Sequence, residues 1–162
     1  MYHAERVIKR GNEPSYIQSP YKYFAPDNIY DLNDASDLDI MERAIAGARA
    51  KKAIECFKAR ANSQIHDFIY FPSSEPNLFV FCPSAILRGE FPVPYFYRWR
   101  WAVDGKFPGH VITLSDPTFL LDPRLGAGWL VGERENDATR NFANVIKTFC
   151  KTLKIPFKNI VF

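Results

Sequence analysis

Residues 36–60 carry apolar side chains near the spacing of one helical face, namely Leu38, Met41, Ile45, Ala48, Ile54 and Phe57. Ser36 suits the position before a helix, and Asp37 and Asp39 put negative charge in the first turn, where the helix dipole favours it. Lys58 and Arg60 would make the last turn basic. The pattern therefore predicts one long helix.

The residues before this helix show no sustained period. Residues 1–35 are rich in Pro, Tyr, Asn and Asp, which favours turns and irregular backbone. We expect an irregular arm over residues 1–35 whose aromatic side chains pack across a neighbouring surface. The rest of the chain, residues 36–162, is expected to form a single domain.

Short apolar and aromatic runs follow the helix. HDFIYF and LFVFC stand on either side of a Ser, Pro and Asn break, which predicts two adjacent strands. The second run is apolar throughout, as in a strand covered on both faces. YFYRWRW, residues 95–101, fits either a short strand or a packed helical turn. HVITL predicts another strand, which ends before Pro117.

The last third of the chain combines a loop, a helix and a strand. Residues 118–133 contain Gly126, Gly128 and Gly132 and predict a loop. Asn136 or Asp137 can begin an amphipathic helix, whose apolar positions are Phe142, Val145, Ile146, Phe149 and Leu153. KNIVF then predicts a central parallel strand. Strands separated by a helical pattern indicate an α/β fold with a mostly parallel sheet and flanking helices.

Composition limits the class of protein. The chain has 162 residues, of which 47% are hydrophobic and 15% aromatic, so it can build one aromatic-rich core. The net charge of +3 gives no reason to expect nucleic acid or a membrane surface as a partner. Cys56, Cys82 and Cys150 match neither a zinc site nor a disulfide framework. We expect buried thiols, no cofactor and no metal, and, without a secretory signal, a cytoplasmic protein.

Asp116 is the first candidate for chemistry, because it lies in LSDP at the predicted carboxyl end of a strand, where α/β sheets place functional groups. It would orient a loop, bind a hydroxyl or act as an acid or base. The other interpretation is a turn in which its carboxylate accepts backbone N–H groups before Pro117, and we favour this turn. Among the histidines, His110 is expected to be a hydrogen-bonded residue at the core edge rather than a base.

Two further patterns have a structural and a functional interpretation. The glycines of GAGWLVG lack the spacing of a dinucleotide-binding loop, so they favour backbone turns, with Trp129 as a packing anchor. Arg98 and Arg100 alternate with aromatic residues in YFYRWRW, a pattern that can stack on single-stranded nucleic acid. The same alternation describes an edge with Trp inward and Arg outward, and the low net charge favours this second interpretation.

FVFCPSAI, YFYRWRW, HVITLSDPTFLLDPRLGAGWLVGE, a helix and KNIVF occur in this order over residues 66–162. Together they resemble the amino-terminal half of α/β-hydrolases, in particular hydrolase-like proteins of bacterial surface-polysaccharide and accessory-secretion loci. The matching positions are Ser115, Asp116, Pro117, Gly128, Trp129 and Gly132, with residues 159–162 as the strand that precedes the nucleophile elbow. The resemblance implies an esterase or acyltransferase that uses Ser-His-Asp chemistry.

The resemblance also implies what this chain lacks. In α/β-hydrolases the Ser, the Asp or Glu and the His all follow the strand that corresponds to residues 159–162. Only the oxyanion loop remains, around Ser84 or Ala85, so the chain is expected to be a truncated, inactive fragment. It would need its carboxy-terminal half, or else self-associate through an exposed strand edge. The alternative is a non-catalytic binding module that uses residues 91–101.

Overall fold

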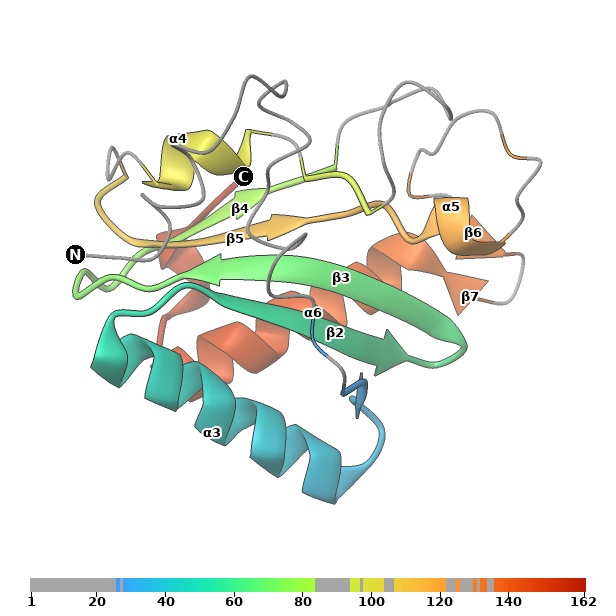
Figure 1. The fold of residues 1–162 in the computed structure, drawn as a ribbon, viewed down its shortest axis with the longest axis horizontal. Coiled ribbons are helices and arrows are strands. Elements are labelled where there is room, and N and C mark those ends of the chain that lie inside the picture. Colours follow the sequence, from blue (N-terminus) through green and yellow to red (C-terminus); the bar gives the residue numbers. More distant parts are fainter. Residues whose placement is uncertain are drawn as a thin grey trace.

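A computed structural model describes residues 26, 28–83, 94–96, 98–103, 107–121, 125, 130, 132–133 and 136–162. The helices and strands in chain order (Figure 1) are β1 (Tyr30–Asp31), α3 (Ala35–Lys51), β2 (Glu55–Ala61), β3 (Gln64–Phe71), β4 (Leu78–Phe81), α4 (Trp99–Val103), β5 (His110–Leu114), α5 (Thr118–Leu121), β6 (Gly132–Glu133), β7 (Asn136–Asp137), α6 (Ala138–Leu153) and β8 (Ile160–Val161). A short 3₁₀ turn, Phe157–Asn159, leads into β8.

Within the described residues, six strands form one mixed sheet in the order β1-β2-β3-β5-β4-β8. All of them run in the same direction except β3, which is antiparallel to both β2 and β5. The predicted α/β arrangement with mostly parallel strands and flanking helices is therefore confirmed. The prediction that β3 and β4 are adjacent is wrong, because the long connection after β4 returns β5 to the place between them.

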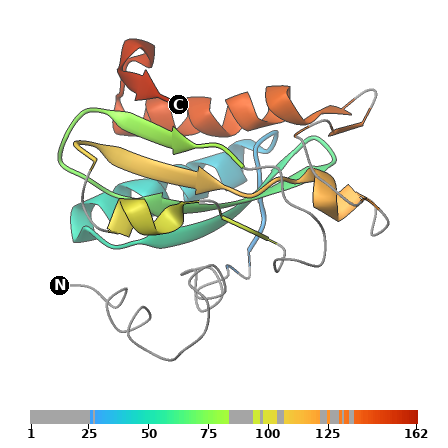
Figure 2. The same cartoon turned by 90° about the horizontal axis from the view of Figure 1, so that it is seen from above.

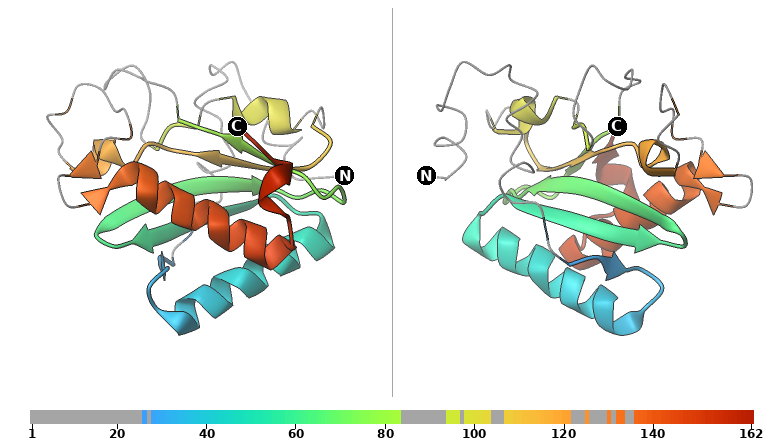
Figure 3. Two further views of the ribbon diagram at one scale, coloured as in Figure 1. Left: turned by 180° about the vertical axis from the view of Figure 1, so that it is seen from behind. Right: turned by 45° about the vertical axis from the view of Figure 1, so that its right-hand side comes forward.

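The two faces of the sheet are covered by different helices. Tyr70 and Ile112 belong to the apolar cluster that packs against α3 and α6. Their chain neighbours Ile69 and Val111 belong to a second cluster, which packs against Trp99 of α4. Since successive side chains of a strand point to opposite faces, α4 lies across the sheet from α3 and α6. Figure 2 shows α4 and α6 on opposite sides of β4 and β5, and Figure 3 shows α3 and α6 on one face.

The predicted helix over residues 36–60 is correct only as far as Lys51. Asp34, and not Ser36, is the N-cap, because its carboxylate accepts the backbone N–H groups of Ser36 and Asp37. The helix ends at Lys52, whose φ of 52° is left-handed. Residues 55–61 instead form β2, which pairs with β3 along its whole length. The apolar spacing in this segment fits a helix, and only the pairing with β3 identifies it as a strand.

Helix α6 agrees closely with its prediction. Asp137 caps it by accepting the N–H groups of Thr139 and Arg140. All five predicted apolar positions are buried, and Phe149 lies at their centre. Its ring meets those of Phe68 and Tyr70 with centroids 5.4 and 5.2 Å away. Such edge-on and tilted packing is the favoured geometry between rings, so aromatic contacts contribute to holding α6 on the sheet.

The two outer strands differ from their predictions. β1 forms within the predicted irregular arm and pairs with β2, and the Tyr30 ring packs 6.2 Å from that of Phe57. Residues 1–25 and 27 of that arm lie outside the described residues. β8 is parallel to β4 as predicted but lies at the edge of the described sheet instead of its centre, with Phe162 76% exposed beside it. Both strands are too short for their surroundings to be inferred from local pattern.

Residues 99–103 form the helical turn that was one of the two alternatives for YFYRWRW. Trp99 points into the core and is 2% exposed, whereas Trp101 is 45% exposed. Among the described residues, no helix combines the length and the apolar character that a membrane span requires.

Candidate functional site

The connections that follow β4 and β5 lead to opposite faces of the sheet. The chain leaves β4 toward α4 on one face, and it leaves β5 toward α6 on the opposite face. β4 and β5 are adjacent and parallel, with Phe81 level with Thr113 near their carboxyl ends. Open α/β sheets bind ligands beyond the carboxyl ends of adjacent strands whose following connections go to opposite faces of the sheet. The carboxyl ends of β4 and β5 are therefore the candidate site.

Asp116 follows the carboxyl end of β5 and is only 4% exposed. Its Oδ1 accepts the backbone N–H of Thr118 at 2.9 Å, and its Oδ2 accepts the N–H of Leu130 at 3.0 Å. The first bond is the turn that we favoured from the sequence. The second joins the end of β5 to the segment that leads into α6. Both carboxylate oxygens accept backbone N–H groups, so Asp116 has a structural role and fixes the backbone that follows β5.

We expect Asp116→Asn to lower the free energy of unfolding by about 1 kcal/mol, because the amide keeps one acceptor oxygen. Asp116→Leu removes both acceptors and leaves two N–H groups without their partner, so it should cost roughly 2–4 kcal/mol. Urea denaturation of both variants measures the difference. Equal and negligible effects of the two substitutions on the free energy of unfolding would contradict this structural role of Asp116.

His66 is a buried residue of this edge that we did not predict. The β3–β5 register pairs Phe68 with Leu114, and its continuation brings His66 level with Asp116. His66 is 0% exposed, and neither ring nitrogen has a hydrogen-bond partner in the described part of the structure. Burial lowers the pKa of His66 to about 4, while the charge of Asp116 acts in the opposite direction. At neutral pH the imidazole of His66 is therefore uncharged.

Thr118, like His66, has a buried polar atom without a hydrogen-bond partner in the described part of the structure. This atom is its hydroxyl oxygen, Oγ1. Buried polar atoms without partners are uncommon in proteins and often mark a bound water or a functional site. The sequence did contain a signal for the burial of His66. In a strand, alternate residues share a face, so His66 lies on the same face as Phe68 and Tyr70.

A buried amide network holds the start of α6 over this edge. The Gln64 Nε2 donates to the Asn136 carbonyl oxygen at 2.7 Å, and the Asn141 Nδ2 donates to the Gln64 Oε1 at 3.0 Å. The Asn62 Nδ2 donates to the Asn141 Oδ1 at 2.7 Å. Residues separated by more than seventy positions thus satisfy one another's polar groups. The network ties the start of α6 to the β2–β3 hairpin.

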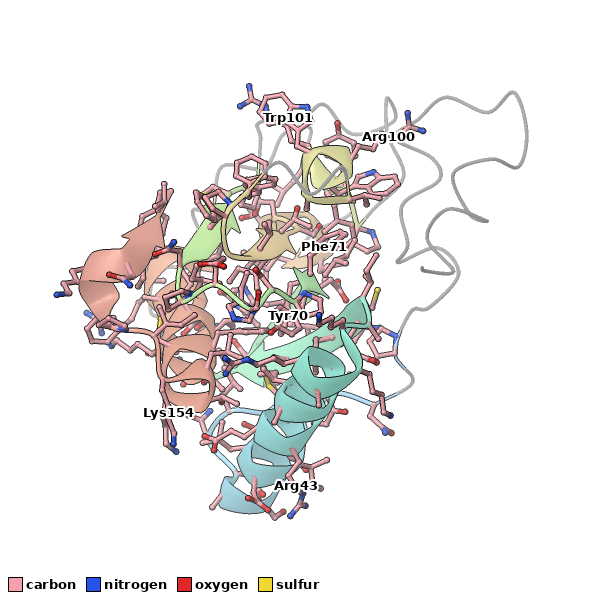
Figure 4. The ribbon with its side chains drawn as sticks, turned by 90° about the vertical axis from the view of Figure 1, so that its left-hand side faces the viewer. Arg43, Tyr70, Phe71, Arg100, Trp101 and Lys154 are labelled. Carbon is pink, nitrogen blue, oxygen red and sulfur yellow. The ribbon has the colours of Figure 1, made fainter. Side chains whose placement is uncertain are left out.

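An apolar cavity of about 460 Å³ lies beside the carboxyl ends of β4 and β8. Its lining residues are Phe79, Val80, Phe81, Cys82, Pro83, Arg98, Trp101, Phe107, Val161 and Phe162. The Arg98 guanidinium lies 4.4 Å from the Trp101 ring centre, a cation–π distance. In Figure 4, Trp101 and Arg100 lie on the α4 side, away from α3. The cavity size is within the range of small-molecule sites.

The structure describes only some of the residues predicted for this site. Ser84, Ala85 and Trp129 lie outside the described residues, so their predicted roles stay predictions. Gly126 and Gly128 lie outside them too, and Gly132 begins β6.

Two of the three cysteines and His110 agree with their predictions. Cys56 and Cys150 are buried as expected, but Cys82 is exposed, because β4 ends at Phe81 and the chain leaves the core there. His110 begins β5, is buried and is bonded to Tyr70, which confirms the predicted core-edge residue.

A scan against family models, a search of curated proteins and a search of solved structures each found no match to this chain.

Proposed function

We propose that this chain forms the oxyanion-loop half of an α/β-hydrolase-like protein that acts on esters. The supporting observation is the direct parallel pairing of β8 with β4, in which Leu78 is level with Ile160 and Phe79 with Val161. In α/β-hydrolases the nucleophile follows a strand of the sheet, and an oxyanion-hole N–H comes from the loop after an earlier strand. With β8 as the nucleophile strand and β4 as the earlier strand, these two segments stand side by side.

The proposed reaction is acyl transfer. A serine after β8 would attack the ester carbonyl, its proton would pass to a histidine, and a carboxylate would orient that histidine. The loop that begins after β4, including Ser84 and Ala85, would donate an N–H to the oxyanion. Because a donor without a nucleophile cannot form the acyl intermediate, residues 1–162 supply the scaffold only. The nucleophile, acid and histidine would come from residues beyond Phe162 or from another chain.

We expect the purified 162-residue chain to hydrolyse p-nitrophenyl acetate and butyrate no faster than buffer does. The reason is that Ser73, Ser74 and Ser84 lack the glycine context that forms a nucleophile elbow. Ser84→Ala serves as the matched variant. Activity that is present in the chain and disappears in Ser84→Ala would overturn the proposal, since it would make Ser84 a nucleophile.

The coding sequence gives an independent test. The proposal expects G-x-S-x-G within a few residues of the codon for Phe162, or in a neighbouring gene, followed by codons for Asp or Glu and then His. A stop codon after Phe162 and no such motif in the neighbouring genes would contradict it.

A non-catalytic binding module remains the second candidate, and the apolar cavity favours it. Arg98 and Trp101, both within the stretch 91–101, line this cavity and put a cation and a ring at its surface.

The two candidates differ in solution behaviour. A self-sufficient module should be monomeric and unfold in one sharp transition. A hydrolase half should self-associate through the outer edge of β8, where Val161 of the strand and the following Phe162 are 47% and 76% exposed. Size-exclusion chromatography with light scattering separates these outcomes.

A further inference from the structure

A second cavity of about 460 Å³ lies at the opposite, amino-terminal edge of β4 and β5. It is enclosed by the ends of α3 and α6 and by the loop between β3 and β4. Its lining residues are Ala46, Arg49, Ala50, Lys52, Ser73, Ser74, Thr152 and Leu153. This cavity shares no residue with the candidate site at the carboxyl edge.

The charges around this cavity are of one sign. Arg49 and Lys52 are its charged lining residues, and no carboxylate is among the described residues that line it. Neither cation takes part in an ion pair within the described part of the chain, whereas the nearby Lys151 is held by Glu42 at 2.8 Å. Among the described residues, no carboxylate therefore pairs with the positive charge at the cavity.

The backbone that carries the two cations is well anchored. Lys52 is the left-handed C-cap of α3, and its N–H donates to the carbonyl oxygens of Ala48 and Arg49. This bond satisfies acceptors at the helix end that would otherwise repel an anion. Two carbonyl oxygens at the end of α3 are thus already hydrogen-bonded, and Arg49 and Lys52 add positive side chains at this end.

The β3–β4 loop adds hydroxyl donors. The Ser73 N–H donates to the His110 Nδ1 at 3.0 Å, and the Ser73 Oγ accepts the N–H of Glu75 at 3.2 Å. The Ser73 hydroxyl therefore keeps its own hydrogen for a ligand, and Ser74 adds a second hydroxyl. Behind the loop, the Tyr70 hydroxyl lies 2.9 Å from the His110 Nδ1, so a buried hydrogen-bonded pair supports the loop. Figure 4 shows Tyr70 between α3 and α6 at this edge.

We propose that this cavity binds the phosphate group of a small phosphate monoester. Arg49 and Lys52 would make charge-assisted hydrogen bonds to the phosphate oxygens, and the hydroxyls of Ser73 and Ser74 would complete the shell. The cavity is larger than a phosphate group needs, and Leu153 supplies an apolar wall on which the organic part of the ester can pack. Guanidinium, ammonium and hydroxyl donors without a carboxylate are the chemistry that selects a dianionic oxyanion.

Binding is measured by following backbone amide shifts while phenyl phosphate is titrated into the ¹⁵N-labelled full chain at constant ionic strength and pH 7.5. We expect saturable shifts at Lys52, Ser73 and Ser74. Inorganic phosphate should bind at least threefold more weakly, because burying each additional methylene-sized group contributes roughly a factor of four. Equal affinity for the two probes, or no saturable shift with either, would overturn the monoester site.

Variants that each remove one positive charge test the two cations. Arg49→Gln and Lys52→Gln should each weaken phenyl phosphate binding about tenfold or more, since hydrogen bonds to charged groups are the strong ones. Arg43→Gln is the control, because Arg43 lies six residues earlier on α3 and pairs with Asp39 at 2.5 Å, outside the cavity. Arg43 and Lys52 are both exposed, so these variants should fold normally. Unchanged affinity in the two cavity variants, or an equal loss in Arg43→Gln, would overturn the proposal.

Discussion

Lowering the pH from 7 to 4 is expected to destabilise the folded chain by several kcal/mol, because folding keeps two buried imidazoles neutral that are protonated in the unfolded chain at pH 4. Burial lowers the pKa values of His66 and His110 to about 4, and the charge of Arg49 further disfavours protonation of His110. In the unfolded chain both groups titrate near 6.5. The pKa values of both histidines are thus lowered by folding.

The direction of the effect follows from proton binding. Well above pH 6.5 both histidines are neutral in the folded and unfolded states, and stability does not depend on their titration. Between pH 6.5 and 4 the unfolded state binds more protons, so the free energy of unfolding falls as the pH falls. Each histidine contributes up to about 3 kcal/mol to this loss. Urea denaturation at pH 7, 5.5 and 4 measures it.

Two variants separate the histidines. His66→Leu removes a group that makes no hydrogen bond in the described part of the structure, so it should leave stability at pH 7 nearly unchanged and remove about half of the acid-induced loss. His110→Leu should already be less stable at pH 7, because Tyr70 and Ser73 lose their shared acceptor. If His66→Leu and the unmodified chain lost the same free energy between pH 7 and 4, the buried neutral state of His66 would be contradicted.

Phe149→Ala is expected to lower the free energy of unfolding by roughly 3–5 kcal/mol, the usual cost of truncating a fully buried aromatic ring. Phe149 is 0% exposed and packs against three rings that come from β2 and β3. The substitution leaves a cavity between α6 and the sheet that rigid strands cannot fill. Thermal and urea denaturation, monitored by circular dichroism, give the magnitude.

Ile40→Ala is the matched control for Phe149→Ala. Ile40 is also a large apolar residue on a helix, but it is 44% exposed on α3, so its truncation should change stability by less than about 1 kcal/mol. Similar effects of the two substitutions would show that α6 does not pack on the sheet as described.

Local pattern determined much of the fold. The capping carboxylate of Asp137 and the apolar spacing from Phe142 to Leu153 predicted α6, since both signals depend only on residues within a few positions of one another. The apolar runs that became β3, β4 and β5 were predicted for the same reason. The turn at Asp116 was also available from sequence, because an Asp before Pro117 bonds to its own following backbone.

Tertiary contacts decided the rest. Ile54 and Phe57 suit a helix by their spacing, yet residues 55–61 form a strand because β3 offers a complete hydrogen-bonding partner. His66 faces Asp116 only after β3 pairs with β5. The cations Arg49 and Lys52 meet Ser73 and Ser74 only when α3 packs beside the β3–β4 loop. The sequence therefore determined α6 with its cap and the strands β3, β4 and β5, because their signals are short-range, but not the N-cap of α3 or the strands β1 and β2. Pairing and packing between distant segments determined the strand order and both cavities.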